Sequence, residues 1–184
     1  LISERIADHL AEWHPFNMEI SLYGSTRGTY ETITGVPGSY QRCLRGIEHL
    51  LQRGLPLELK APLMTLNAHE LKDMIQLANN LGLSFHFDPV IAARINGDTG
   101  PTALRLPPEE IIQYELNDER RASTWPEKIA SYKGKNIDVP AMYTCGAGRT
   151  SFHMDAFGQL SLCLSARTPS YNLRDGQFTE AWQD

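Results

Sequence analysis

Hydrophobic positions along the first part of the chain switch between a helical and a strand spacing. Ile2, Ile6, Leu10 and Trp13 recur on one face of a 3.6-residue period. The apolar run at 18–24 follows directly and is typical of a buried strand. A helix followed by a strand is therefore predicted at the start of the chain.

The same alternation continues further along the chain. Residues 24–38 are rich in Gly, Thr and Ser, and this composition predicts a long loop. Beyond it, periodic apolar positions and terminal glycines predict a helix over 39–54, a strand over 55–64, a helix over 67–82 and a strand over 83–91.

Helices alternating with strands predict an α/β fold with parallel strands joined by right-handed crossovers. Functional side chains in such folds gather beyond the carboxyl ends of the strands, which here means 21–27, 60–67 and 88–94. His86 and Asp88 alternate on one side of the third strand, so they either pair in the mouth of the sheet or His86 is an ordinary core histidine.

The chain changes character after the third strand. Residues 93–108 are typical of a loop, 107–120 predict a helix with Pro and Glu in its first turn, and 125–141 are polar enough to form a connector. The cysteine-bearing segment beyond them is expected to be a separate C-terminal unit.

Two of the three cysteines, Cys145 and Cys163, are the first and last residues of the segment CGAGRTSFHMDAFGQLSLC. A turn at 155–158 predicts a β-hairpin, which holds its two strands roughly 5 Å apart. Thiolates in one pocket suit an iron–sulfur cluster or zinc, although two thiolates are half of the usual ligand set. The alternatives are two buried thiols, a disulfide, or a partial zinc site that includes His153. Cys43 lies on an apolar helix face and is expected in the core.

Composition narrows the classes of function. The 184 residues are 41% hydrophobic and 21% charged, as in ordinary globular proteins. A net charge of −5 and a pI near 5.7 argue against a nucleic-acid partner. No apolar run approaches the roughly 20 residues that span a bilayer, so no membrane association is expected and a cytoplasmic location is predicted.

Several short motifs, taken in their order along the chain, resemble those of a known protein family. MEISLYG, ITGVPGSY, KAPLMTLN and the spacing Cys145, twelve residues, Gly158, four residues, Cys163 together resemble the radical SAM superfamily with a SPASM-type extension. The resemblance implies the second half of a partial (β/α) barrel followed by a small cysteine-bearing β-hairpin unit. It divides the chain into the barrel half at 1–105, a helix and connector at 106–140, and a truncated auxiliary-cluster region at 141–184.

By this resemblance the parent enzyme uses S-adenosylmethionine and [4Fe-4S] clusters. Ser21 matches a strand position near the cofactor, and Lys60 stands at a strand end where its ammonium could meet a carboxylate. Cys145 and Cys163 match auxiliary-cluster ligands. The simpler interpretations are a backbone-bonded Ser21 and a solvated Lys60. No catalytic residue is assigned.

The resemblance also implies hydrogen abstraction from a peptide or protein substrate by the parent. The C-x-x-x-C-x-x-C loop that reduces S-adenosylmethionine is not in this sequence, so we expect a fragment that is inactive alone and that dimerises through an exposed strand edge. One alternative is a non-catalytic peptide-binding or protein-binding module. Another is an α/β barrel enzyme that uses Lys60 as a Schiff-base nucleophile.

Overall fold

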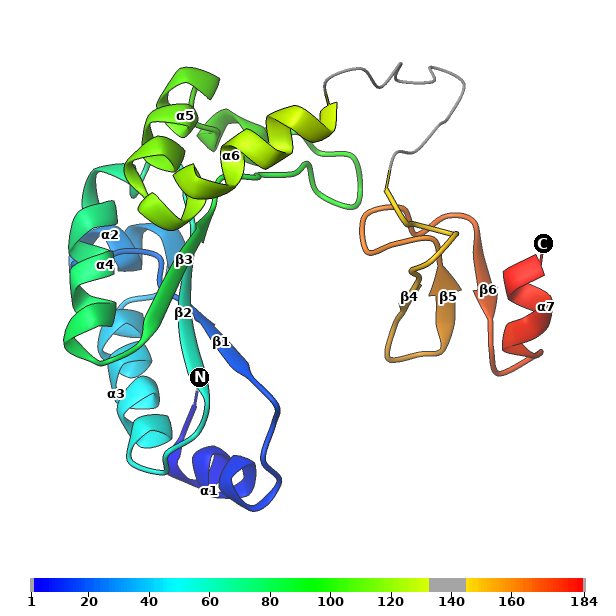
Figure 1. Cartoon of the computed structure of the whole chain (residues 1–184). Coiled ribbons are helices and arrows are strands. Elements are labelled where there is room, and N and C mark those ends of the chain that lie inside the picture. Colours follow the sequence, from blue (N-terminus) through cyan, green and yellow to red (C-terminus); the bar gives the residue numbers. More distant parts are fainter. Residues whose placement is uncertain (1, 133–144, 184) are drawn as a thin grey trace. The chain divides into compact units, whose positions relative to one another are not determined.

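The computed structural model describes residues 2–132 and 145–183 and separates into two compact units, Leu1–Ala122 and Ser123–Asp184 (Figure 1). The predicted divisions at 105 and 140 remain a prediction. Each unit is described by itself.

A parallel sheet of three strands forms the centre of the first unit. Its order is β1 (Met18–Ser21), β2 (Leu57–Pro62) and β3 (Ser84–Asp88), and both neighbouring pairs are parallel. The helices of this part are α1 (Glu4–Glu12), α2 (Arg27–Thr34), α3 (Ser39–Leu51) and α4 (Leu71–Asn80), with a 3-10 turn η1 (Ala68–Glu70) before α4. The predicted α/β class with parallel strands is confirmed, and the second half of a barrel stays a prediction.

The sheet buries one face. Along β2, Leu57, Leu59 and Ala61 are buried and alternate with partly exposed residues, because successive side chains of a strand point to opposite faces. In Figure 1, α2, α3 and α4 lie on one side of the sheet. The core contains side chains from both layers, among them Ile47, Leu50, Leu59, Met74, Phe85 and Phe87.

The loop predicted over 24–38 is wrong for Arg27–Thr34, which form α2. The Thr26 hydroxyl accepts a hydrogen bond from the Thr29 N–H at 3.3 Å, and this N-terminal cap starts the helix. Gly35 ends it at φ 66°, a left-handed conformation that glycine adopts without steric cost. The polar and glycine residues that suggested a loop thus include those that begin and end α2.

The connector predicted over 125–141 is also wrong for its first part. After η2 (Gly100–Leu104) and the predicted helix α5 (Pro108–Asn117), α6 runs over Glu119–Tyr132 with Pro126 inside it. The Asp118 carboxylate starts α6 by accepting from the backbone N–H groups of Arg120 and Arg121, at 3.0 and 3.3 Å. The rest of the predicted connector lies outside the described residues.

The second unit contains a small antiparallel sheet of β4 (His153–Met154), β5 (Gln159–Ser161) and β6 (Ser170–Asn172), followed by α7 (Phe178–Gln183). The turn between β4 and β5 has Gly158 at φ 83°. The Asp155 carboxylate accepts from the N–H groups of Phe157 and Gln159 at 2.8 and 3.0 Å. Neither Cys145 nor Cys163 belongs to these strands, because β4 and β5 are shorter than the predicted hairpin.

Candidate functional site on the open face of the parallel sheet

Charged and polar side chains occupy the sheet face opposite the core. Ser21 pairs in register with Lys60, and Lys60 pairs with His86. Residues in register on adjacent strands project to the same side, so these three form a row across the sheet. Glu19 and Glu58 are in register with each other, two residues before Ser21 and Lys60 on their strands, and therefore lie on the same side of the sheet. Ser21 and Lys60, which the sequence singled out separately, are therefore neighbours.

Lys60 is engaged with a carboxylate in this face. Its Nζ donates a hydrogen bond to Glu19 Oε2, and 39% of the Lys60 side chain remains exposed. The hydrogen bond from Lys60 lowers the pKa of Glu19, partial burial opposes that shift, and the charges of Lys60 and His86 add to the lowering. Lys60 is thus ion-paired with Glu19 rather than simply solvated.

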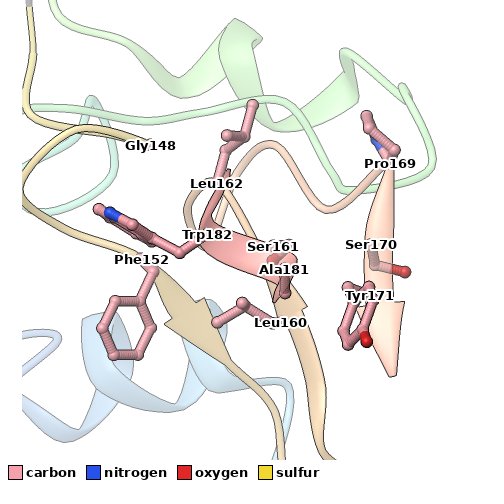
Figure 2. Close-up of a pocket in the computed structure, with 10 residues that line it drawn as sticks. All are labelled: Gly148, Phe152, Leu160, Ser161, Leu162, Pro169, Ser170, Tyr171, Ala181 and Trp182. Atoms are coloured by element: carbon pink, nitrogen blue, oxygen red, sulfur yellow. The ribbon is translucent and has the colours of Figure 1, made fainter. Parts of the chain in front are cut away.

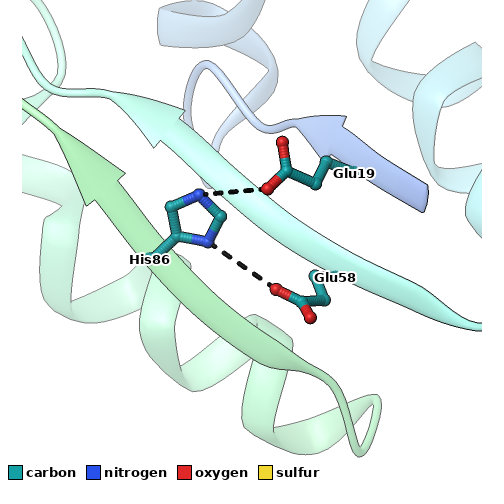
Figure 3. A group of neighbouring side chains, drawn as sticks. All are labelled: Glu19, Glu58 and His86. Carbon is teal, nitrogen blue, oxygen red and sulfur yellow. Dashed lines mark ion pairs between the residues drawn. The ribbon is translucent and has the colours of Figure 1, made fainter. Parts of the chain in front are cut away.

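His86 lies between two carboxylates from neighbouring strands. Its Nε2 is 3.5 Å from Glu19 Oε1, and its Nδ1 is 3.9 Å from Glu58 Oε2 (Figure 3). The predicted pairing with Asp88 is not what the structure shows, since the Asp88 carboxylate accepts from the Val90 N–H. Sequence reasoning missed Glu19 and Glu58. Their alternation with apolar residues in MEIS and LELK was the signal that placed them on the open face.

Glu70 connects the loop after β1 to the start of α4. Its carboxylate accepts five hydrogen bonds, from the N–H and hydroxyl groups of Ser25 and Thr26 and from the Thr29 hydroxyl. Burial raises its pKa, but the hydrogen bonds from Thr26, Thr29 and Ser25 outweigh burial and bring the pKa to about 2. A carboxylate that is charged at neutral pH therefore fixes the loop at the carboxyl end of β1.

Asn67 performs a similar role after β2. It is fully buried, donates to the carbonyl oxygens of Tyr23 and Pro62 at 3.1 and 3.0 Å, and accepts from the Met64 N–H at 2.9 Å. The loops at the ends of β1 and β2 are consequently tied to each other. Segments 21–27 and 60–67, where functional groups were expected, thus have a defined conformation.

All three cysteines are free thiols. Cys43 is buried, as expected for a core position, whereas Cys145 is exposed and Cys163 is partly exposed. Cys163 Sγ accepts a hydrogen bond from the Ala166 N–H at 3.2 Å. His153 Nε2 is buried and, within the part of the chain that the structure describes, lacks a hydrogen-bond partner.

The second unit also contains an apolar pocket of about 520 Å³. Phe152, Leu160, Leu162, Tyr171 and Trp182 lie around it (Figure 2). Phe152 and Trp182 make an edge contact with ring centres 5.9 Å apart, which gives this wall an aromatic surface. Leu162 is the residue before Cys163, so the pocket adjoins one of the candidate ligand positions.

Comparison with known proteins gives three similar relatives, each named AdoMet-dependent heme synthase. The relative from Methanosarcina barkeri (strain Fusaro / DSM 804) is 23% identical over 202 residues, covering 100% of this chain and 58% of the relative. That from Nitratidesulfovibrio vulgaris is 23% identical over 184 residues, covering 89% and 50%. That from Oleidesulfovibrio alaskensis is 23% identical over 203 residues, covering 100% and 52%.

The chain spans between 50% and 58% of the length of these relatives. No family model matches it. Among the helices that the structure describes, none has the length and apolar content needed to cross a membrane.

Proposed function

We propose that this chain, a member of the radical SAM superfamily, is part of an S-adenosylmethionine-dependent iron–sulfur oxidoreductase that acts on a tetrapyrrole. The observation that carries the proposal is the similarity to three heme synthases, which extends over 89% to 100% of this chain. The names of these relatives give no support to a peptide substrate, which was the substrate expected from the sequence.

The open face of the parallel sheet has the chemistry that S-adenosylmethionine requires. The cofactor carries an amino acid group and ribose hydroxyls, which bind hydrogen-bond donors, acceptors and charges. Ser21 and Lys60 lie side by side in register, and the Lys60 ammonium has three N–H donors, of which Glu19 takes one. In the proposed role, Lys60 binds the cofactor carboxylate and Ser21 hydrogen-bonds beside it.

The cysteines of the second unit have the chemistry of an iron–sulfur site. Cys145 and Cys163 are free and accessible to different extents, and the Ala166 N–H already points at Cys163 Sγ. Two thiolates are half of the ligands that a cluster usually takes. In the proposed role, these cysteines bind part of an auxiliary cluster, and the cluster supplies electron transfer when bound.

Cofactor binding is tested on this chain by calorimetric titration with S-adenosylmethionine. We expect binding that Lys60→Met and Ser21→Ala weaken, Lys60→Met by about 10-fold or more because it removes a charge-assisted hydrogen bond. Lys72→Met is the matched control, since Lys72 is an exposed lysine on α4. Equal binding by Lys60→Met and Lys72→Met would contradict the role of Lys60.

The cluster is tested by the iron, acid-labile sulfide and zinc content after anaerobic reconstitution. Iron and sulfide should fall in Cys145→Ser and Cys163→Ser and stay unchanged in Cys43→Ser, whose thiol is in the core. Zinc without sulfide would indicate a structural metal instead.

The substrate class is tested by titrating the chain with an iron porphyrin and following its absorption band. Saturable binding supports the tetrapyrrole proposal. Binding of unstructured peptides with no response to the porphyrin would favour the peptide substrate predicted from the resemblance.

A further inference from the structure

We propose that Glu19, Glu58 and His86 form a binding site for a divalent first-row metal ion, because their ligand atoms converge on the open sheet face from three neighbouring strands. One carboxylate oxygen from each glutamate and one imidazole nitrogen lie within 4.8 Å of one another. This site is separate from the thiolates of the second unit and does not depend on the proposed radical chemistry.

The two carboxylates are oriented by donors outside the group of three. Lys60 Nζ binds Oε2 of Glu19, and Asn17 Nδ2 donates to Oε1 of Glu58 at 3.2 Å. The remaining oxygens, Oε1 of Glu19 and Oε2 of Glu58, are the two that face His86. Ligating carboxylates in metal sites are commonly held in this way by an outer shell of hydrogen bonds.

The charge of the group favours a cation. Two carboxylates and one ammonium leave a net charge of −1 when the imidazole is neutral. A neutral imidazole also has a lone pair that no cation in this group uses. A positive ion between the three side chains would neutralise the excess charge and take that lone pair.

The ligand set indicates which metal is bound. One imidazole and two carboxylates suit Mn²⁺, Fe²⁺, Co²⁺ or Zn²⁺, whereas Mg²⁺ and Ca²⁺ prefer oxygen ligands throughout. Metal–ligand bonds of about 2.1 Å bring ligand atoms to about 3.4 Å from one another. Glu19 Oε1 and His86 Nε2 are already 3.5 Å apart. Glu58 Oε2 lies nearest the other ring nitrogen, 3.9 Å from Nδ1, so the Glu58 side chain, which is 39% exposed, has to rotate toward Nε2 to complete the site.

Strand spacing explains why these three residues meet. Parallel strands lie about 4.8 Å apart, so side chains on one face of three consecutive strands span about 10 Å at their backbones. Glu19 on β1 is long enough to reach across the central strand β2, which carries Glu58, and the His86 ring on β3 faces both carboxylates (Figure 3). Three ligands and open positions toward solvent form an incomplete coordination shell that water or a bound molecule can complete.

The experiment is a titration of the chain with Mn²⁺, followed by the loss of the free-ion electron paramagnetic resonance signal. Cys145→Ser/Cys163→Ser is used as the background, so that thiolates do not contribute. We expect one saturable ion per chain and an affinity at least about 10-fold lower in His86→Gln and in Glu58→Gln. Glu48→Gln and His9→Gln, both on exposed helix positions, should bind Mn²⁺ as the background does.

Asn17→Ala gives a second test, because it removes a holding donor without changing a charge or a ligand. We expect the affinity to fall by about 10-fold. Far-ultraviolet circular dichroism of each variant verifies the fold. Absence of saturable binding in the background protein, or binding that survives His86→Gln unchanged, would overturn the proposal. The second result would mean that other side chains bind the ion.

Discussion

Thr29 Oγ1 donates a hydrogen bond of 2.5 Å to Glu70 Oε1, which lies 41 residues further along the chain. This contact joins the first turn of α2 to the turn before α4. The same carboxylate accepts from Ser25 and Thr26, so one buried anion defines the end of β1 and the start of α2. Anions near a helix N-terminus are further favoured by the helix dipole.

The first prediction concerns acid stability. The carboxyl of Glu70 has a pKa of about 2 in the folded chain and an ordinary value of 4.5. As the pH falls, the unfolded state therefore takes up the proton first, and the free energy of unfolding decreases. We expect a loss of up to about 3 kcal/mol between pH 5 and pH 2 from this group.

The measurement is urea unfolding at a series of pH values for the wild type and Glu70→Gln. Glu70→Gln lacks the ionisation, so its stability should change less over this range. At neutral pH it should be less stable by about 2–4 kcal/mol, because an amide cannot accept all of the hydrogen bonds that the carboxylate accepts. Parallel pH profiles of the two proteins would contradict the assignment.

The second prediction concerns Asn67. Asn67→Ala leaves the Met64 N–H and the carbonyl oxygens of Tyr23 and Pro62 without their partner in a buried place. The free energy of unfolding should decrease by about 2–4 kcal/mol. Asn79→Ala on the exposed side of α4 is the matched control and should cost less than about 1 kcal/mol. Equal effects of the two substitutions would refute the bridging role.

The third prediction concerns the pairing of α6 with β3. Arg121 donates to Glu115, which is buried, and to the Phe87 carbonyl, and its guanidinium lies 3.9 Å from the centre of the Phe87 ring. Arg121→Met should destabilise the chain by about 2–4 kcal/mol, since the Glu115 carboxylate loses its ion pair. The exposed Arg45→Met should have little effect.

A double mutant separates the ion pair from the packing in this prediction. If the charge on Glu115 causes the loss, Arg121→Met/Glu115→Gln should recover part of the stability. No recovery would mean that the ring contact and the carbonyl contact carry the effect.

The fourth prediction is dimerisation through β1. Arg120 and Arg121 donate to the carbonyl oxygens of Phe85 and Phe87 on β3, whereas the outer edge of β1 has no strand beside it within the described residues. An uncovered strand edge favours pairing with a second copy. Sedimentation equilibrium should show a monomer–dimer exchange that depends on protein concentration.

Ser21→Pro tests which edge is used. The N–H groups of Met18 and Leu22 donate to the carbonyl oxygens of Pro56 and Lys60, so the alternation of a strand directs the Ser21 N–H to the outer edge. Proline removes that donor and leaves the pairing with β2 intact, so the dimer should weaken. A wild-type chain that stays monomeric at every concentration would contradict the prediction.

Local patterns predicted most of the first unit correctly. The helices over 39–51 and 71–80 and the three strands follow from apolar periodicity, because one face of each element must be buried. The helix Arg27–Thr34 was missed because the Glu70 carboxylate that stabilises its first turn is remote in the sequence. When a carboxylate far away in the sequence stabilises the first turn of a polar helix, the composition of the helix itself is the same as that of a loop.

The candidate site divides in the same way. The sequence pattern placed Ser21 and Lys60 toward the carboxyl ends of their own strands. It also placed His86 on one face of its strand, since a side-chain period of two is a property of each strand alone. The register between strands, in contrast, is not a property of any single strand. Only the tertiary structure decided that Glu19, Glu58 and His86 face one another. Glu19 and Glu58 are 39 residues apart in the sequence and Glu58 and His86 are 28 apart, so their meeting depends on how three helices pack behind the sheet.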